Sequence, residues 1–139
     1  MRNNLVLGLL MVAALSTVRG SVARALTSAR AFSERTGLSP AEATSLALIT
    51  EEWLNNIIEH GAAPPTARII LRFRRAPGLV RLMVSDAGVS FDPRRAVFDG
   101  PNTSRGGGAG LALIQAWCQI ADYRRHRGRN RLVFEMSIP

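Results

Sequence analysis

The chain has 139 residues, of which 47% are hydrophobic, and this length and composition predict a single globular domain over residues 1–139. The formal net charge is +8, and all the lysine-plus-arginine charge comes from arginine because the sequence contains no lysine. The lack of lysine excludes a Walker P-loop and a eukaryotic-type kinase fold, since each places a lysine on the nucleotide phosphates.

The basic charge favours an acidic protein partner or bound phosphates over a nucleic acid. The arginines are scattered, apart from a small cluster over residues 124–131, and no interleaved aromatic residues accompany them. We therefore expect no direct nucleic-acid binding. Cys118 is the single cysteine, and His60 and His126 are the only histidines, so neither a disulfide framework nor a zinc site is expected.

The N-terminal segment over residues 5–15 is almost entirely apolar. After Arg2 it has the character of the apolar part of a secretory signal, although it is too short to span a membrane. The preferred interpretation is a buried first strand, and no membrane association is expected.

A first helix is predicted to begin at a Ser16 or Thr17 cap and to run to about Arg35. Its apolar residues recur at helical spacing, and Gly37 ends it. This stripe consists of Val18, Val22, Ala25, Ala29 and Phe32.

A second helix begins at the capping box of Ser39 and Glu42, with Pro40 at its first position. It is expected to end at about His60, before Gly61. Its core-facing residues are Leu46, Ile49, Trp53 and Ile57.

This second helix carries an acid and an amide one turn apart. Glu52 and Asn56 therefore project from one face. An amide oxygen is a ligand that Mg²⁺ accepts, and a carboxylate one turn earlier could take a proton from an attacking hydroxyl. Glu51 and Asn55 share the same spacing, and a merely solvated helix face is the alternative interpretation.

A hairpin follows, with strands over residues 68–74 and 79–85. The first strand alternates polar residues with the apolar Ile69, Leu71 and Phe73, which predicts one exposed face, and Asp86 and Gly88 come directly after the hairpin. The Asp86 carboxylate can accept a hydrogen bond from the exocyclic amine of adenine, whereas guanine would present a carbonyl there. Gly88 would let the base approach the backbone closely. An ordinary Asp–Ala–Gly turn is the alternative.

Residues 86–107 lack periodicity, which is typical of a functional lid. The glycine run that follows opens a helix, so its backbone amides could hold phosphate oxygens. The run consists of Gly106, Gly107, Gly108, Ala109, Gly110 and Leu111. Arg105 precedes it and could steady the charge on the terminal phosphate, unless it is simply a solvated loop arginine.

A third helix is predicted from about Ala109 to Ile120. Two closing strands are expected over about residues 122–126 and 131–138. Residues 128–130 would join them.

The order of these motifs resembles the GHKL (histidine kinase-like) ATPase superfamily, and most closely its anti-sigma-factor serine/threonine kinases. The resemblance covers about residues 18–136 and is firmest over residues 52–61, 84–93 and 107–112, while residues 123–132 resemble the anti-sigma kinases specifically. It implies an α/β fold of the Bergerat type: a two-layer α/β sandwich with a mixed sheet and its helices on one face.

The resemblance also implies roles for the motif residues. Glu52 and Arg105 would be catalytic, and Asn56 would bind the metal, since the family places a histidine four residues after its asparagine and only Asn56 has His60 there. Nucleotide contacts would come from Asn56, Asp86, Gly88 and the run over residues 106–111.

One departure from the family pattern concerns the last strand. Many relatives carry a threonine there that contacts adenine through water, and by register this chain is predicted to have Val133 at that position.

By resemblance, the chain would be a cytoplasmic kinase that binds ATP with Mg²⁺. It would phosphorylate a STAS-domain anti-sigma antagonist and so switch partners with a sigma factor or similar regulator, with homodimerisation left open. One alternative is a non-catalytic, ATP-dependent partner switch, and the presence of Glu52 argues against it. The other is the catalytic domain of a split histidine kinase. The chain has no phosphoacceptor helix with a His–Glu pair, so the acceptor would lie elsewhere, and the anti-sigma-like ending argues against this alternative.

Overall fold

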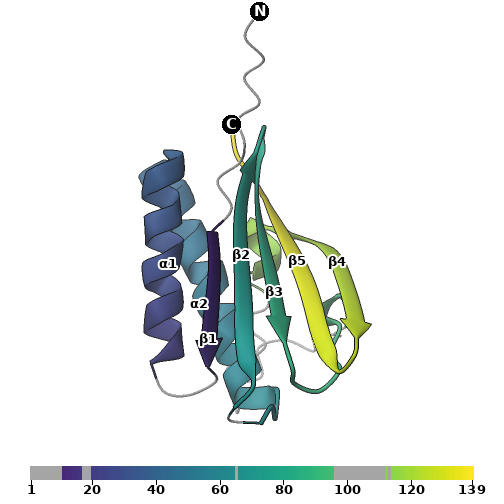
Figure 1. Ribbon diagram of the computed structural model, residues 1–139. Coiled ribbons are helices and arrows are strands. Elements are labelled where there is room, and N and C mark those ends of the chain that lie inside the picture. The colour runs from purple at the N-terminus through teal and green to yellow at the C-terminus, as the bar shows by residue number, and fades with distance from the viewer. Residues whose placement is uncertain (1–10, 17–19, 65, 96–111, 113) are drawn as a thin grey trace, which may run out of the picture.

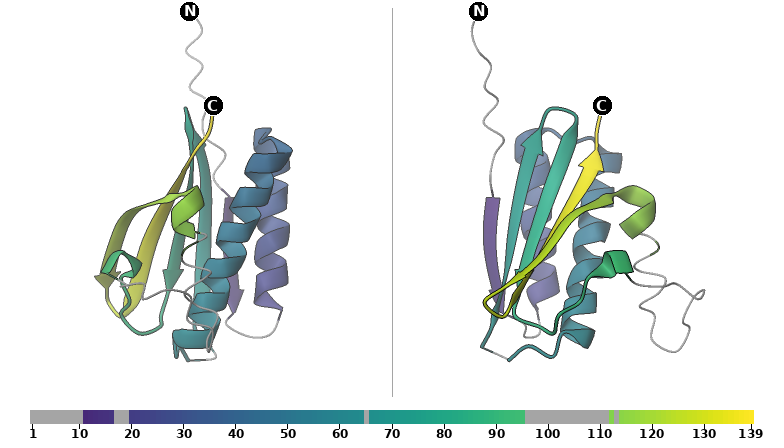
Figure 2. Two further views of the ribbon diagram at one scale, coloured as in Figure 1. Left: turned by 180° about the vertical axis from the view of Figure 1, so that it is seen from behind. Right: turned by 90° about the vertical axis from the view of Figure 1, so that its right-hand side faces the viewer.

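The computed structural model describes residues 11–16, 20–64, 66–95, 112 and 114–139. These residues form two layers, a five-stranded sheet and helices that cover one of its faces (Figures 1 and 2). The predicted two-layer α/β sandwich with its helices on one face is thereby confirmed. Within the described ranges, no helix has the length and apolar content needed to cross a bilayer.

The first helix, α1 (Ser21–Thr36), begins later than predicted. Its N-cap is Gly20, which makes no side-chain capping bond, and Ser16 is the last residue of a strand. Sequence reasoning chose the nearest capping side chain, but pairing with the neighbouring strand keeps Ser16 extended. The helix ends as predicted at Gly37, whose φ of 70° suits a residue without a Cβ.

The second helix, α2 (Pro40–His60), agrees with prediction at both ends. Glu42 N donates to Ser39 Oγ at 3.2 Å, and Ser39 N donates to Glu42 Oε1 at 2.8 Å, which completes the capping box. These bonds pair backbone donors that the first turn would otherwise leave without partners. The hydrogen bonds also hold the pKa of Glu42 below its usual value.

The sheet has the order β1-β2-β3-β5-β4. Its strands are β1 (Met11–Ser16), β2 (Arg68–Ala76), β3 (Leu79–Asp86), β4 (Gln119–His126) and β5 (Arg129–Ser137). Every pairing is antiparallel, so the expectation of a mixed sheet is wrong for the described strands. Two helices of opposite direction separate β1 from β2, which reverses the second strand, and β5 lies between β3 and β4 (Figure 1).

The third predicted helix ends earlier than expected. Helical residues are described at 112 and 114–117, and β4 begins at Gln119 rather than at residue 122. The register of β4 against β5 shifts between Ile120 and Asp122. This irregularity breaks the two-residue alternation by which a strand is recognised in a sequence, and it explains the error. The turn to β5 lies at Arg127 and Gly128, where φ is positive in both residues.

The hydrophobic core fills the space between the helices and the sheet. On β2 the alternate residues Ile69, Leu71 and Phe73 are fully buried, as predicted. Phe32 of α1 stacks on Phe73 with ring centroids 5.5 Å apart. The predicted apolar stripe of α2 is also buried: Leu46, Ile49, Trp53 and Ile57. The orientation of α2 over the sheet is therefore fixed by its buried face.

Candidate nucleotide-binding site

The Asp86 motif packs against the C-terminal end of α2. Val89 N donates to the Gly61 carbonyl oxygen at 2.7 Å. A Cβ on Gly88 would lie 2.6 Å from that oxygen and 2.9 Å from Asp86 Oδ1. Glycine is thus required here by the close approach of the two backbone segments. The fold therefore brings the end of the helix that carries Glu52 and Asn56 next to the Asp86 motif.

The Asp86 carboxylate lies at the carboxyl end of β3 and is only 4% exposed. Its Oδ1 accepts hydrogen bonds from Gly88 N at 2.9 Å and from Asn130 Nδ2 at 3.1 Å. Hydrogen bonds within the described residues do not use Oδ2. The side chain is therefore held at a fixed position, which a group that reads a base by hydrogen bonding requires.

Asn130, which sequence reasoning missed, is the centre of a buried polar network. Its Nδ2 donates to Asp86 Oδ1 and, at 2.8 Å, to the Val89 carbonyl oxygen. Its Oδ1 accepts from Tyr123 Oη at 2.5 Å and from Arg125 Nη1 at 3.0 Å. Asn130 is 5% exposed, and this set of partners satisfies both ends of its amide.

The prediction that placed Val133 at the adenine side of the last strand is wrong. Val133 pairs with Met83 on the sheet face that points away from the helices, whereas Asn130 pairs directly with Asp86. The sequence contains the signal that could have corrected it, because alternate residues of a strand share a face. The core-facing residues of β5 are Leu132, Phe134 and Met136. These three residues and Asn130 are even-numbered, so they lie on the same face of β5, whereas Val133 lies on the opposite face.

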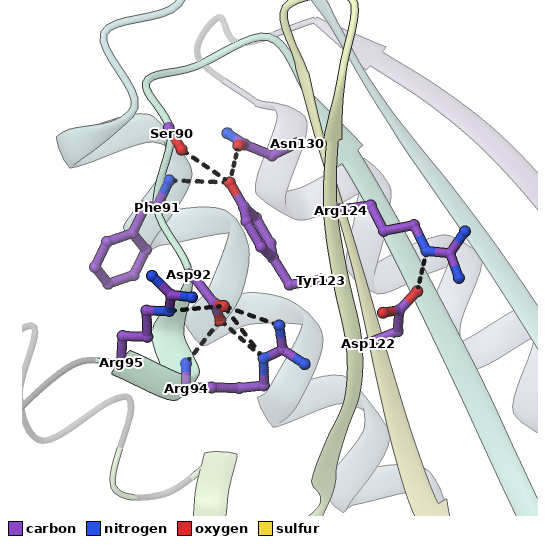
Figure 3. Close-up of polar contacts among 9 residues, drawn as sticks. All are labelled: Ser90, Phe91, Asp92, Arg94, Arg95, Asp122, Tyr123, Arg124 and Asn130. Atoms are coloured by element: carbon purple, nitrogen blue, oxygen red, sulfur yellow. Dashed lines mark hydrogen bonds and ion pairs between the residues drawn. The ribbon is translucent and has the colours of Figure 1, made fainter.

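Two further side chains from β4 hold the segment that follows Asp86. Tyr123 Oη accepts from Phe91 N at 3.2 Å and shares a hydrogen bond of 3.2 Å with Ser90 Oγ (Figure 3). Arg125 Nη1 donates to the Gly88 carbonyl oxygen at 2.9 Å. The backbone from residue 88 to residue 91 is therefore supported by α2 on one side and by β4 on the other.

Aromatic contacts join α2 to the same segment. Trp53 stacks on Phe91 with ring centroids 6.1 Å apart and meets Phe134 of β5 edge-on at 5.6 Å. Because a helix turns about 100° per residue, Asn56 lies about 60° around α2 from Trp53, and Asn55 about 160°. Asn56 is thus on the side of α2 that faces the Asp86 segment, and it is partly exposed there, like Glu52.

The predicted lid over residues 86–107 is described as far as Arg95. Arg94 Nε and Nη2 donate to the two carboxylate oxygens of Asp92 at 3.0 and 2.9 Å (Figure 3). The Arg94 side-chain hydrogen bonds hold the pKa of Asp92 below its usual value. A hollow of about 520 Å³ lies beside this turn, lined by Ser90, Phe91, Asp92, Arg94, Arg95 and Tyr123.

The third motif lies outside the described residues. This holds for Arg105 and for Gly106, Gly107, Gly108, Ala109, Gly110 and Leu111. The described chain resumes as a helix whose Ile114 is buried in the core. Cys118 N then donates to the Ile114 carbonyl oxygen at 2.9 Å.

Comparisons with known proteins agree with this arrangement. A family model described as "Histidine kinase-like ATPase domain" matches residues 11–136. The serine/threonine-protein kinase BtrW of Bordetella bronchiseptica is 34% identical over 95 residues, a match that covers 63% of this chain and 66% of that kinase. This chain thus spans just under two thirds of that relative's length.

Two solved structures share the fold. The SiaB–SiaC complex of Pseudomonas aeruginosa contains a chain with a TM-score of 0.59 and 14% identity, covering 95% of this chain and 91% of that one. The histidine kinase AdeS of Acinetobacter baumannii gives a TM-score of 0.53 and 13% identity, covering 91% of this chain and 67% of that one. At these identities the likeness concerns the fold alone.

Proposed function

Because the chain belongs to the histidine kinase-like ATPase domain family, we propose that it is a protein kinase. It would transfer the γ-phosphate of ATP to a serine or threonine of a STAS-domain anti-sigma antagonist. The observation that carries this proposal is the meeting of α2 with the Asp86 segment through the Gly88–Gly61 and Trp53–Phe91 contacts. The similarity to a serine/threonine-protein kinase supports the same reaction class.

Asp86 would select adenine. Its buried carboxylate accepts hydrogen bonds, so the exocyclic amine of adenine is a matching donor and the guanine carbonyl is not. Hydrogen bonds from Asn130 Nδ2 and Gly88 N fix the position of this carboxylate before any nucleotide arrives. A fixed acceptor loses little freedom on binding, which favours affinity as well as selectivity.

Asn56 would supply the protein's ligand to Mg²⁺. An amide oxygen is a hard donor, and Mg²⁺ commonly takes only one or two protein ligands beside phosphate oxygens and water. The ion would neutralise phosphate charge during transfer. The partial exposure of Asn56, on the side of α2 that faces the Asp86 segment, suits this role.

Glu52 would be the catalytic base, accepting the proton of the substrate hydroxyl. It lies one helical turn before Asn56 and is partly exposed. Arg105, which lies outside the described residues, would stabilise negative charge on the transferred phosphoryl group, and the run over residues 106–111 would hold phosphate oxygens with backbone amides.

A partner protein would complete the function. One fold neighbour is a chain of the SiaB–SiaC complex, and BtrW is a serine/threonine-protein kinase. For this chain, phosphorylation of the antagonist would release it and leave the kinase free to hold a sigma factor or similar regulator. In the alternative, a non-catalytic partner switch, ATP would regulate binding and Glu52 would have no chemical role.

Three variants of α2 test this assignment. Glu52→Gln keeps the side-chain shape and removes the base, so Mg·ATP affinity by calorimetry should be nearly unchanged. Transfer of radiolabelled phosphate to a STAS partner should fall by roughly 10²–10⁴-fold, the usual worth of a positioned base. Asn56→Ala should weaken both Mg-dependent ATP binding and transfer. Glu51→Gln is the matched control and should change neither.

Two results would contradict this assignment. Wild-type protein that binds Mg·ATP but transfers no phosphate to any STAS partner, with Glu52→Gln indistinguishable from it, would replace the kinase by the partner switch. Loss of transfer in Glu51→Gln would mean that the active pair is Glu51 and Asn55.

A further inference from the structure

The sheet face that points away from the helices is rich in arginine. On β2 the fully buried Ile69, Leu71 and Phe73 alternate with residues that must point to the other side. The pairings Arg72↔Met83 and Ser85↔Arg131 extend this face across β3 and β5. We call it the arginine face, defined by Arg68, Arg72, Arg74, Arg81, Arg124, Arg129 and Arg131.

Acidic side chains neutralise only part of this surface. Arg81 Nη2 lies 2.8 Å from Glu135 Oε1, and Arg124 Nε lies 2.9 Å from Asp122 Oδ2. Figure 3 shows the Asp122–Arg124 pair on the opposite side of β4 from Tyr123. The other arginines of the face have no acidic partner within the described residues: Arg68, Arg72, Arg74, Arg129 and Arg131.

The Arg129 side chain is held in place by hydrogen bonds to uncharged groups and not by a carboxylate. Its Nε donates to Ser85 Oγ at 2.9 Å, and its Nη2 donates to the carbonyl oxygens of Arg68 at 2.8 Å and Ser85 at 3.0 Å. Backbone and hydroxyl acceptors leave its charge uncompensated while they restrict its motion. Such a pre-oriented guanidinium suits the recognition of a carboxylate. It lines a hollow of about 630 Å³ together with Ser85, Arg124, Arg125, His126 and Arg131.

The centre of the arginine face is apolar. Met83 and Val133 pair with each other there and are only 7% and 8% exposed. No described element covers this side of the sheet (Figure 1). Met83 and Val133 are therefore covered by the long side chains around them, and the surface offered to a partner consists mainly of arginine, which is enriched in protein–protein interfaces.

We propose that the arginine face is a docking surface for a partner protein with an acidic surface. The unneutralised guanidinium groups would pair with its carboxylates. A second copy of the chain is disfavoured because two arginine faces would repel each other. A nucleic acid is disfavoured because the described outward positions of β2, β3, β4 and β5 carry no phenylalanine, tyrosine or tryptophan for base stacking.

This inference does not depend on the proposed kinase activity. The Asp86 network lies on the helix side of the sheet, and the arginine face lies on the other. The two proposals can therefore fail separately, and binding to the arginine face is measured without nucleotide.

The test uses fluorescently labelled poly-L-glutamate as the acidic probe. Its affinity for the full chain is measured by anisotropy. Arg72→Glu/Arg131→Glu reverses two charges on the arginine face, and Arg24→Glu/Arg30→Glu reverses two exposed charges on α1 with the same change in net charge. We expect the face variant to bind about tenfold or more weakly than the α1 control, because local pairing adds to long-range attraction. Arg72→Gln/Arg131→Gln should show a smaller loss in the same direction, with an unchanged circular dichroism spectrum.

Three outcomes would overturn the inference. Equal weakening in the two charge-reversal variants would show that only net charge matters. Tighter binding of a short DNA duplex than of poly-L-glutamate, lost in the face variant, would identify a nucleic-acid surface. A wild-type dimer in sedimentation experiments that the face variant dissociates would identify a second copy as the occupant.

Discussion

Asn130 shows how one residue can organise a site without carrying its chemistry. It bonds to Asp86, to the backbone at Val89, and to Tyr123 and Arg125. These partners come from two strands and the segment that follows β3. Since Asn130 and Asp86 are buried, loss of the Asn130 amide removes a hydrogen-bond partner from a carboxylate that water reaches poorly.

Asn130→Ala should therefore destabilise the protein and weaken ATP binding. Unpairing buried polar groups costs about 1–3 kcal/mol, so the free energy of unfolding in urea should fall by that order. ATP affinity should fall as well, because the Asp86 carboxylate loses a donor that positions it. Asn55→Ala, which removes a partly exposed amide from α2, is the control and should change both quantities little. Equal effects of the two substitutions would contradict the organising role of Asn130.

The lone described thiol is predicted to be unreactive in the folded protein. Burial raises the pKa of Cys118 to about 12, and Sγ donates to the Ile114 carbonyl oxygen at 3.0 Å. At neutral pH the thiolate is therefore scarce, and a disulfide reagent should react roughly tenfold or more slowly in buffer than in denaturant. Because the folded-state pKa is raised, the stability linked to this thiol is present at neutral pH and is lost as the pH rises toward 12. Equal rates in both solvents would contradict the burial of Cys118.

At the scale of elements, the site depends on the contact between α2 and the segment after β3. The backbones of Gly61 and Gly88 are so close that no side chain fits between them. The core stripe of α2 fixes the helix, and the β3–β5 pairing fixes Asp86. The site therefore forms where two independently positioned elements meet.

Gly88→Ala should separate nucleotide binding from general stability. The new Cβ would lie 2.6 Å from the Gly61 carbonyl oxygen, so the segment must move away from α2. We expect ATP affinity to fall about tenfold or more, because a misplaced contact group loses its binding energy. Gly78→Ala is the matched control: its Cβ would meet nothing within 4 Å, although its φ of +76° strains the substituted residue. It should lose about 1–2 kcal/mol of stability and retain ATP affinity.

The candidate nucleotide-binding site and the arginine face are both built on the same sheet. The helix side carries the core and the Asp86 network, and the other side carries the arginine face. A single core joins α1, α2, β2, β3 and β5, and partly buried residues of β4 pack against it, so the described domain should unfold cooperatively. Ligand binding to the folded state alone then raises the stability of the whole molecule.

Mg·ATP should raise the free energy of unfolding by about 2.7 kcal/mol at a concentration a hundred times its Kd. GTP at the same concentration should stabilise the protein less, because Asp86 lacks a donor to pair with. Differential scanning fluorimetry measures both shifts. Asp86→Asn should weaken ATP binding on the order of 1–3 kcal/mol and reduce the difference between the two nucleotides. Equal shifts for ATP and GTP in the wild type would contradict the assignment of Asp86.

The sequence by itself determined the elements whose signals are local. The capping box at Ser39, the glycine at the end of α1 and the alternation around Leu71 depend on neighbours within a few residues, and the structure confirms each of them. The motif order identified the family for the same reason, since each motif is a short stretch of chain. The roles of Glu52, Asn56 and Arg105 stay predictions.

Only the tertiary structure decided what depends on pairing between distant segments. Asp86 and Asn130 are 44 residues apart, so which residue of β5 reaches Asp86 depends on the register of the closing hairpin, and an error of three positions selected Val133. The shift between Ile120 and Asp122 hid the start of β4. The antiparallel insertion of β5 between β3 and β4, and with it the arginine face, follows from hydrogen bonds between strands, which no local pattern of side chains records.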